Sequence, residues 1–600
     1  RGRELLPELI PEGKVVLPDF VQREDAAVGL FHRLLFSVLV DADFLDAERH
    51  FHPDCPPEPK MTITMEDLWA RFEVDQRRLM DSAPQTEVNF ARREIYEACL
   101  EAASQPPGIY RLSVPTGGGK TRSAMGFALR QALHHGHHRI FYVMPYTTVT
   151  DEVADLFFGI FGRDAHGRSV VLEHHSAVES PIVDVEDDAH YSQMWPRLAA
   201  ENWDAPIVVT TTTQLFGSIF AHHGNRVRKI HRLARSVVII EEAQSIPGEV
   251  LTPILDVLRE LCARYGATVV LCTAAPTSFD AIPPFASVGA PEIVPDAARY
   301  LKHLHRVTYD WRIDDALTWE EVAGLVANEP EALVVVNTKA HAARLLKTLG
   351  DPEALHLSTL ICGAHRRRVV AEVRRRLAGG EPCHLVSTQI VQAGIDLDFP
   401  LVLRALGPLG NIIQAAGRCN REGRLQQGRV IIFRPIARQL PPGFYREATS
   451  ITTALSILHG LDLDNPDSVR AFFSRLYRSM DTDRYRVREA RAAFDFPEVA
   501  RRFRLPGAET TSVVVPYGST EERGHVLDLL AGLRTGGINH RLALRDLQPY
   551  MVQLRAEQVE RLRRRGLVAM VMPGLAQWLG DYDSRTGLIG VDREADEAII

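Results

Sequence analysis

The sequence predicts an α/β protein with two tandem parallel-sheet domains, a helical segment at the N-terminal side and a mostly helical C-terminal accessory region. Short apolar runs typical of buried strands recur between residues 85 and 436, and turn residues and helical patterns follow them. A glycine-rich loop separates one such strand from its helix, and a second series of strands and helices begins near residue 300. Strands that alternate with helices favour parallel sheets.

The composition is that of a globular protein able to bury several cores. The chain has 600 residues, 45% hydrophobic and 24% charged, and its length suggests about three to five domains. A net charge of −8 provides no overall basic field for nucleic acid, although a groove can still be locally basic. No apolar run approaches the roughly 20 residues of a membrane span.

The seven cysteines include no C-x-x-C pair. We therefore expect no structural zinc and predict a reduced, cytoplasmic setting. Because the chain starts at Arg1 rather than Met, we expect a fragment or a processed form.

Residues 114–121, VPTGGGKT, form a glycine-rich loop between an apolar strand and a helix. Such a loop lets backbone N–H groups surround phosphate oxygens at the positive end of the helix. Lys120 supplies a cation for the β- and γ-phosphates, and Thr121 supplies a hydroxyl for Mg²⁺. The first glycine of the usual phosphate-loop pattern is replaced by Val114, and a flexible turn is the alternative. The remaining loop residues predicted to bind ATP are Thr116, Gly117, Gly118 and Gly119.

The apolar run at residues 236–240 ends in two carboxylates. A phosphate-loop ATPase needs one acid for the Mg²⁺ shell and a second to orient water. Glu241 and Glu242 suit these roles, and Gln244 is placed to sense the γ-phosphate. Two glutamates after a strand are common, so the prediction depends on their position after the glycine loop.

Residues 412–424, IIQAAGRCNREGR, predict a helix with Gln414, Arg418 and Arg421 on one face. Two arginines placed in this way could reach a γ-phosphate held by the first domain and act as arginine fingers. The alternative is a solvated basic helix.

The N-terminal side holds a helical pattern at residues 26–46, with Asp41 and Asp43 at its far end. Spacing alone favours acids on a solvated face over metal ligands. The proline-rich residues 52–60 predict a linker, and the pattern after residue 436 is mostly helical.

Taken in order, several strings resemble the motif series of superfamily 2 helicases: PTGGGKT, EEAQ, TAA, VSTQIVQAGID and QAAGRCNR. The flanking strings resemble more narrowly the CRISPR-associated helicase-nuclease of type I interference systems. These are LFSVLVDADFLDAE, ENWDAPIVVTTTTQLF, HLSTLICGAHRRR, VSTQIVQAGIDLDFP and QAAGRCNREG. The resemblance extends from about residue 30 to the YDSRTGL tail.

This resemblance implies two RecA-like domains that hold ATP between them. The implied boundaries are 1–55 for the end of an HD nuclease domain, 56–84 for a linker, 85–290 and 291–436 for the two RecA-like domains, and 437–600 for linker helices and an accessory domain.

The implied activity is that of an ATP- and Mg²⁺-dependent 3′→5′ DNA translocase. A crRNA-guided surveillance complex would recruit it to an R-loop, where it unwinds DNA and feeds the displaced single strand to an HD nuclease site. That nuclease site would take a divalent transition metal if its domain were complete.

The resemblance also assigns residues that spacing alone leaves open. Asp43 matches the last metal ligand of the HD site, which reverses the interpretation from spacing, and Asp396 falls in the ATP-binding motif after the second series of strands. The residues implied in nucleic-acid binding are Thr147, Thr212, Thr338, His365 and Thr388.

Three departures from the family pattern stand out. The histidines and the His-Asp pair that complete an HD site are expected upstream of Asp43, where this chain has no room for them. We therefore do not expect it to cut DNA unless missing sequence or a separate polypeptide supplies that half. Glu241 replaces the usual aspartate, and Ala275 replaces the last threonine of the third motif. From these two changes we predict slower or less tightly coupled ATP turnover than in a typical member.

Two rival hypotheses remain open. The chain could be a general superfamily 2 DNA or RNA helicase, which RNA-dependent ATP hydrolysis would favour. It could also be an ATPase relic that binds nucleic acid or a partner, which ATP binding without hydrolysis would favour.

Overall fold

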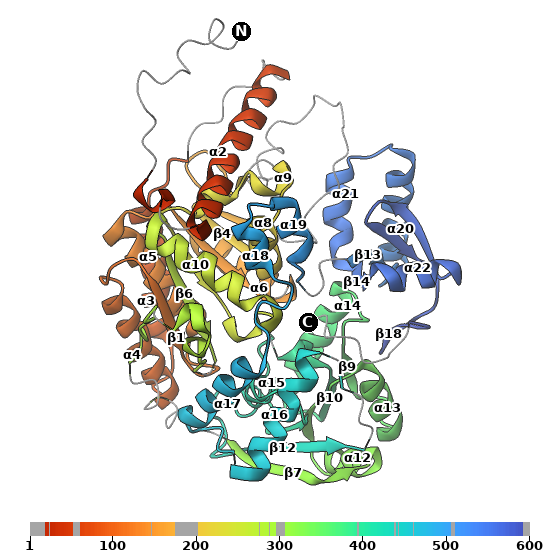
Figure 1. Ribbon diagram of the computed structural model, residues 1–600. Coiled ribbons are helices and arrows are strands. Elements are labelled where there is room, and N and C mark those ends of the chain that lie inside the picture. The colour runs from red at the N-terminus through yellow and green to blue at the C-terminus, as the bar shows by residue number, and fades with distance from the viewer. Residues whose placement is uncertain are drawn as a thin grey trace, which may run out of the picture.

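The computed structural model contains two parallel six-stranded sheets, one in each of two tandem domains (Figure 1). It describes residues 18–591 except 23–24, 52–60, 146, 175–201, 275, 287, 296–299, 301–306, 393–394, 437–439, 442, 460 and 506–509. The predicted α/β class with two tandem parallel-sheet domains is therefore confirmed. Among the helices described, none is long and apolar enough to cross a membrane.

The first sheet has the strand order β1-β6-β5-β2-β4-β3, with every pairing parallel. Strands β4, β5 and β6 are buried along their whole length, which explains their continuous apolar and β-branched sequence. The strands are β1 (Ile109–Ser113), β2 (Arg139–Met144), β3 (Val171–His174), β4 (Ile207–Thr211), β5 (Ser236–Ile240) and β6 (Thr268–Thr273). The main helices are α4 (Glu87–Ala102), α5 (Lys120–His135), α6 (Thr147–Phe161), α8 (Thr212–Ile219) and α10 (Leu251–Tyr265).

The second sheet has the order β7-β12-β11-β8-β10-β9, again with parallel pairings throughout. Its strands are β7 (Val307–Leu317), β8 (Glu331–Val335), β9 (Leu355–Leu357), β10 (Cys383–Ser387), β11 (Leu401–Ala405) and β12 (Gly428–Pro435). Its helices are α12 (Trp319–Ala327), α13 (Lys339–Leu349), α14 (Gly363–Gly379) and α15 (Leu409–Ala416).

The strand order places the candidate site at the carboxyl edge of the first sheet. Strands β1 and β5 both pair with β6, so the loops that follow them leave the sheet two strand spacings apart. That separation is roughly 10 Å, which long side chains from the two loops can bridge. Ligands of open parallel sheets bind at this edge.

The segment 56–84, predicted as a linker, contains a packed helix. Helix α3 (Met65–Ser82) is N-capped by Thr64, whose hydroxyl accepts from the backbone of Asp67 while the Asp67 carboxylate accepts from the backbone of Thr64. Phe72 is fully buried on its inner face, and α3 packs against α5 and α6. The capping box and the apolar face attach this segment to the first domain.

Helix α2 (Asp25–Phe51) is anchored on the first domain through Asp41. The Arg228 guanidinium donates to the Asp41 carboxylate from Nε at 3.0 Å, and its Nη2 lies at the same distance. His231 and Arg232 approach the other carboxylate oxygen at 3.7 and 3.8 Å. The side chains of Asp41 and Arg228 are only 6% and 3% exposed, so the pair is structural.

We expect Asp41→Asn to loosen α2, because the substitution leaves Arg228 buried without its counter-charge. Removing one partner of a buried pair costs about 3 kcal/mol or more. Amide hydrogen exchange of α2 measures this as a lower free energy of local opening. Asp43→Asn is the matched control: Asp43 is exposed on the same helix, and its change should stay within about 0.5 kcal/mol. Equal effects of the two substitutions would contradict the anchoring role.

Four helices lead from the second domain back to the first: α16 (Phe444–His459), α17 (Pro466–Ser479), α18 (Val487–Ala492) and α19 (Phe496–Arg502). Arg488 in α18 pairs with the buried Asp256 of α10 at 2.7 Å. Beyond α19, the Phe503 ring stacks on Phe220 with centroids 4.0 Å apart. These contacts tie the linker helices to the first domain.

The C-terminal region contains a four-stranded sheet that the sequence analysis did not predict, in addition to helices. Its strand order is β14-β13-β16-β15, and Figure 1 shows the region in blue beside the two sheet domains. The strands are β13 (Thr510–Val514), β14 (Met551–Arg555), β15 (Val568–Met572) and β16 (Leu575–Trp578). The helices are α20 (Thr520–Thr535), α21 (His540–Leu547) and α22 (Ala556–Arg564).

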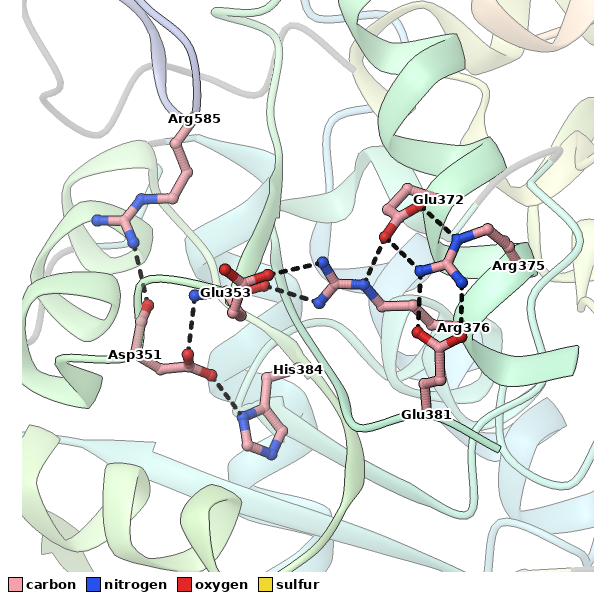
Figure 2. Close-up of polar contacts among 8 residues, drawn as sticks. All are labelled: Asp351, Glu353, Glu372, Arg375, Arg376, Glu381, His384 and Arg585. Atoms are coloured by element: carbon pink, nitrogen blue, oxygen red, sulfur yellow. Dashed lines mark hydrogen bonds and ion pairs between the residues drawn. The ribbon is translucent and has the colours of Figure 1, made fainter. Parts of the chain in front are cut away.

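A hairpin of β17 (Tyr582–Asp583) and β18 (Gly587–Leu588) attaches this region to the second domain. The Leu588 amide donates to the Leu360 carbonyl at 3.1 Å. Arg585 donates to the Asp351 carbonyl at 3.1 Å, and the Asp351 carboxylate lies 3.0 Å from His384. Figure 2 shows the contacts of Asp351 with Arg585 and His384 beside an arginine–glutamate network that continues along α14.

Candidate nucleotide-binding site

The glycine loop adopts a backbone conformation that requires its glycines. The backbone of Gly117 and Gly119 has φ of 86° and 80°, a left-handed region that glycine enters without strain. A Cβ at Gly118 would lie 2.5 Å from a Val114 methyl group, so a side chain does not fit there. Helix α5 begins directly after the loop at Lys120, which directs its positive end toward the loop.

The two carboxylates after β5 lie in different environments. Lys120 Nζ is 3.4 Å from Glu242 Oε1, whereas Glu241 is buried and accepts a hydrogen bond from the Tyr142 hydroxyl. The same hydroxyl bonds the side chain of Thr121. The Tyr142 hydroxyl therefore contacts both Thr121 and Glu241, so the two residues predicted to bind Mg²⁺ lie close together.

The electrostatics keep Lys120 and Glu242 charged. Burial alone lowers the pKa of Lys120, but the carboxylates of Glu242 and Glu241 raise it above its usual value. Burial raises the pKa of Glu242, but Lys120 and hydrogen bonds from Gln414 and Gln244 bring it below its usual value. Burial dominates at Glu241 and raises its pKa, because Lys120 only partly offsets the loss of solvent.

The second domain reaches the same carboxylate. Gln414 of α15 donates from Nε2 to Glu242 Oε2 at 3.0 Å, and Gln244 donates to the same oxygen. Closer to the glycine loop, a Cβ at Gly417 would lie 2.7 Å from Thr116 Cβ. Glu242 is thus bonded from both domains, and the second domain packs directly on the loop.

Arg418 and Arg421 do not lie on one helical face, which corrects the prediction for residues 412–424. Helix α15 ends at Ala416, and Asn420 takes a left-handed φ of 45°, so both arginines lie in the turn after the helix. The helix ends at its C-cap Gly417, where the chain packs against Thr116 of the first domain.

The two arginines have different surroundings. Arg418 is buried and donates to the carbonyls of Val391 and Gln392 at 3.1 and 2.6 Å. Burial and the neighbouring Arg421 lower its pKa to about 10. Arg421 pairs with Asp396 at 2.7 Å, and its Cγ would lie 3.8 Å from a Cβ at Gly117. Arg421 is therefore the arginine placed beside the glycine loop.

Three of the residues predicted to bind nucleic acid make contacts within the protein. The Thr212 hydroxyl donates to the Met144 carbonyl, and the Thr338 hydroxyl caps α13. His365 is 2% exposed, bonded to Tyr582 and stacked on Tyr517, so it does not face solvent. The C-terminal hairpin covers it, which sequence patterns do not reveal.

The structure gives less information about the other residues that the sequence analysis singled out. Thr388 follows β10, and its backbone donates to Leu357, while the side chain of Thr147 and the whole of Ala275 lie outside the described residues. Asp43 is exposed, and the described residues contain no group of three candidate metal ligands. Its role at an HD site, and the expected effect of Glu241 and Ala275 on turnover, stay predictions.

The sequence analysis missed Tyr142. It lies in the buried strand β2 and bonds both Thr121 and Glu241. The sequence pattern predicts that a tyrosine in an apolar strand is a core residue. Its partners become apparent only from the sheet order, which places β2 beside β5.

Two parallel sheets, a glycine loop on the first and a facing turn with Arg418 and Arg421 on the second are typical of two-domain helicases. We call this turn the arginine turn. A DEAD/DEAH box helicase model matches residues 93–282, and the model of the CRISPR-associated nuclease/helicase Cas3, C-terminal, matches residues 328–424. The predicted resemblance to the CRISPR-associated helicase-nucleases is thus confirmed over the helicase region.

Curated relatives carry the same family name. The CRISPR-associated nuclease/helicase Cas3 of Haloferax volcanii is 26% identical over 453 residues, which is 57% of this chain and 48% of the relative. That of Methanothermobacter thermautotrophicus is 23% identical over 370 residues, covering 57% and 42%. The chain spans about half the length of the curated relatives it matches.

Solved structures share the fold. The crystal structure of T. fusca Cas3-AMPPNP aligns with 86% of this chain and 69% of its own, at 18% identity and a TM-score of 0.57. A structure of a CRISPR RNA-guided surveillance complex, pre-nicking, has a chain that aligns with 82% of this one and 69% of its own, at 18% identity and a TM-score of 0.50.

Proposed function

We propose that this chain is an ATP-dependent single-stranded-DNA translocase of type I CRISPR interference, moving 3′→5′ and unwinding target DNA at an R-loop. The observation that supports the proposal most strongly is the double attachment of Glu242. Lys120 from the glycine loop and Gln414 from the second domain contact the two oxygens of this one carboxylate. A site shared in this way can link ATP turnover to movement between the domains.

In the proposed mechanism the glycine loop and Lys120 hold the triphosphate of ATP. Thr121 and Glu241, both bonded to Tyr142, fit the ligand set of a Mg²⁺ ion, which when bound neutralises phosphate charge. Glu242, kept ionised by Lys120 and the two glutamines, orients the attacking water. Gln244 and Gln414 hold the Glu242 carboxylate in place until a γ-phosphate competes for them.

Arg421 stabilises the charge that develops on the transferred phosphoryl group, as arginine fingers do. Arg418 holds the turn that carries Arg421, because it bonds the backbone of residues 391 and 392. Closure of the two domains on ATP and reopening after hydrolysis then advances the chain along one strand. Contacts to the DNA backbone make the binding tolerant of sequence and sensitive to salt.

The partners in this proposal are the displaced strand of an R-loop and a crRNA-guided surveillance complex in the cytoplasm. A solved structure with the same fold is that of a CRISPR RNA-guided surveillance complex, pre-nicking, which supports the choice of partner. Cutting is assigned to an HD nuclease site, of which the described residues supply only Asp43.

Partial duplexes test substrate and polarity together. We expect ATP-dependent unwinding of a DNA duplex with a 3′ single-stranded overhang, little unwinding with a 5′ overhang, and weak activity on RNA. Preference for an RNA strand would favour a general helicase. ATP binding without hydrolysis or unwinding would favour the relic.

A further inference from the structure

Arg92 of α4 contacts the glycine loop. Its Nε donates to the Gly117 carbonyl at 2.7 Å. Its side-chain stem lies against Gly119, where an added Cβ would be 3.6 Å from Arg92 Cγ. The side chain is 30% exposed, so the contact lies at the rim of the nucleotide site.

The orientation of Arg92 is fixed by a second bond within the same helix. Arg92 Nη1 donates to Asn89 Oδ1 at 2.9 Å, and Asn89 Nδ2 donates to the Pro84 carbonyl at 2.9 Å. The backbone of Asn89 in turn donates to Thr86, the N-cap of α4. The guanidinium is therefore held by the first turn of α4 before it meets the loop.

The third nitrogen of Arg92 reaches the second domain. Arg92 Nη2 lies 3.5 Å from Glu422 Oε1, and the same oxygen lies 3.9 Å from Arg421 Nε. Glu422 therefore lies between an arginine of the first domain and the arginine beside the glycine loop. We call the contacts from Gly117 through Arg92 to Glu422 the Arg92 bridge.

We propose that Arg92 is a positioning residue of the nucleotide site. Through Gly117 it sets the shape of the glycine loop, and through Glu422 it holds Arg421 next to that loop. The Arg92 bridge couples the conformation of the glycine loop to the position of the second domain, because one guanidinium contacts both Gly117 and Glu422. This inference rests on the proposed ATP-driven motor and adds a residue that none of the helicase motif strings contains.

Arginine suits this role and lysine does not. Three separate nitrogens of Arg92 face three partners in fixed directions, whereas an ammonium at the end of a flexible stem reaches fewer of them. We therefore expect Arg92→Lys to restore only part of what Arg92→Gln loses.

A double-mutant cycle tests the bridge. Arg92→Gln removes a charged hydrogen bond, so KM for ATP should rise about tenfold, and DNA-stimulated kcat should fall. Glu422→Gln removes only a partly exposed ion pair, so kcat should fall up to about fivefold with KM near that of the wild type. The double variant should be no worse than Arg92→Gln, because both changes break one chain of contacts.

Arg93→Gln is the matched control, since Arg93 is the exposed neighbour on the same helix. Unchanged melting temperatures in the absence of nucleotide show that the variants are folded. Strictly additive effects in the cycle, or an Arg92→Gln phenotype equal to that of Arg93→Gln, would overturn the proposal.

The affinity for AMPPNP, a non-hydrolysable ATP analogue, distinguishes failure of the Arg92 proposal from failure of the proposed ATP-driven motor. Arg92→Gln should weaken the binding of the analogue about tenfold even if the chain hydrolyses nothing. Binding without hydrolysis would overturn the motor, and the affinities of the variants would still decide the role of Arg92. Wild-type chain that binds no nucleotide would overturn both.

Discussion

Replacing Arg421 by alanine lowers ATP turnover by about 10³- to 10⁵-fold, the loss expected for an arginine finger. The side chain lies beside Gly117 and is held by Asp396 at 2.7 Å. A γ-phosphate in the glycine loop would compete with Asp396 for it. Since Arg421 is not part of the core, the variant should fold and bind ATP, and the loss should appear in kcat.

Arg424→Ala is the matched control for Arg421. Arg424 lies three residues further along the same turn, its side chain is 67% exposed, and it is 3.9 Å from Asp398. We expect its turnover to remain near that of the wild type. If Arg421→Ala stayed within tenfold of the wild type while Arg424→Ala did the same, Arg421 would not be the finger.

Replacing Lys120 by alanine lowers turnover by about 10²- to 10³-fold or more, the usual effect of removing a donor aimed at developing charge. Lys120 also keeps the Glu242 carboxylate ionised, so the variant loses a phosphate contact and weakens the group that orients water. Both effects act on the chemical step. Steady-state hydrolysis with saturating single-stranded DNA measures the loss.

Arg130→Ala, on the same helix α5, is the control for Lys120. Arg130 lies over the Trp69 ring at 5.3 Å, away from the glycine loop. Its turnover should not change. Normal hydrolysis by Lys120→Ala would mean that the glycine loop binds no triphosphate.

The parts of the site that could be predicted from sequence are those encoded by local chemistry. Three consecutive glycines before a lysine permit the left-handed backbone that the phosphate loop adopts at Gly117 and Gly119. The order of the glycine loop before the strand ending in Glu241 and Glu242 then predicted that these carboxylates serve the same ATP site, and the structure places Lys120 3.4 Å from Glu242.

The remaining features depend on tertiary contacts. The pattern of residues 412–424 suits a helix, but Gly417 ends it and packs on Thr116 of the other domain. His365 resembles an exposed motif residue until the C-terminal hairpin, more than 200 residues later, covers it. Strands β13 and β14 carry polar residues and are only partly buried, so they lack the continuous apolar run that distinguishes the buried strands of the first sheet.

ATP hydrolysis by the purified chain, with and without single-stranded DNA, tests the proposed motor most directly. We predict hydrolysis that single-stranded DNA stimulates and that single-stranded RNA stimulates little, at a rate below that of relatives with aspartate in place of Glu241. A folded chain that binds ATP but does not hydrolyse it, with or without DNA, would contradict the proposal. In that case the two domains bind ATP but do not use its hydrolysis to drive movement.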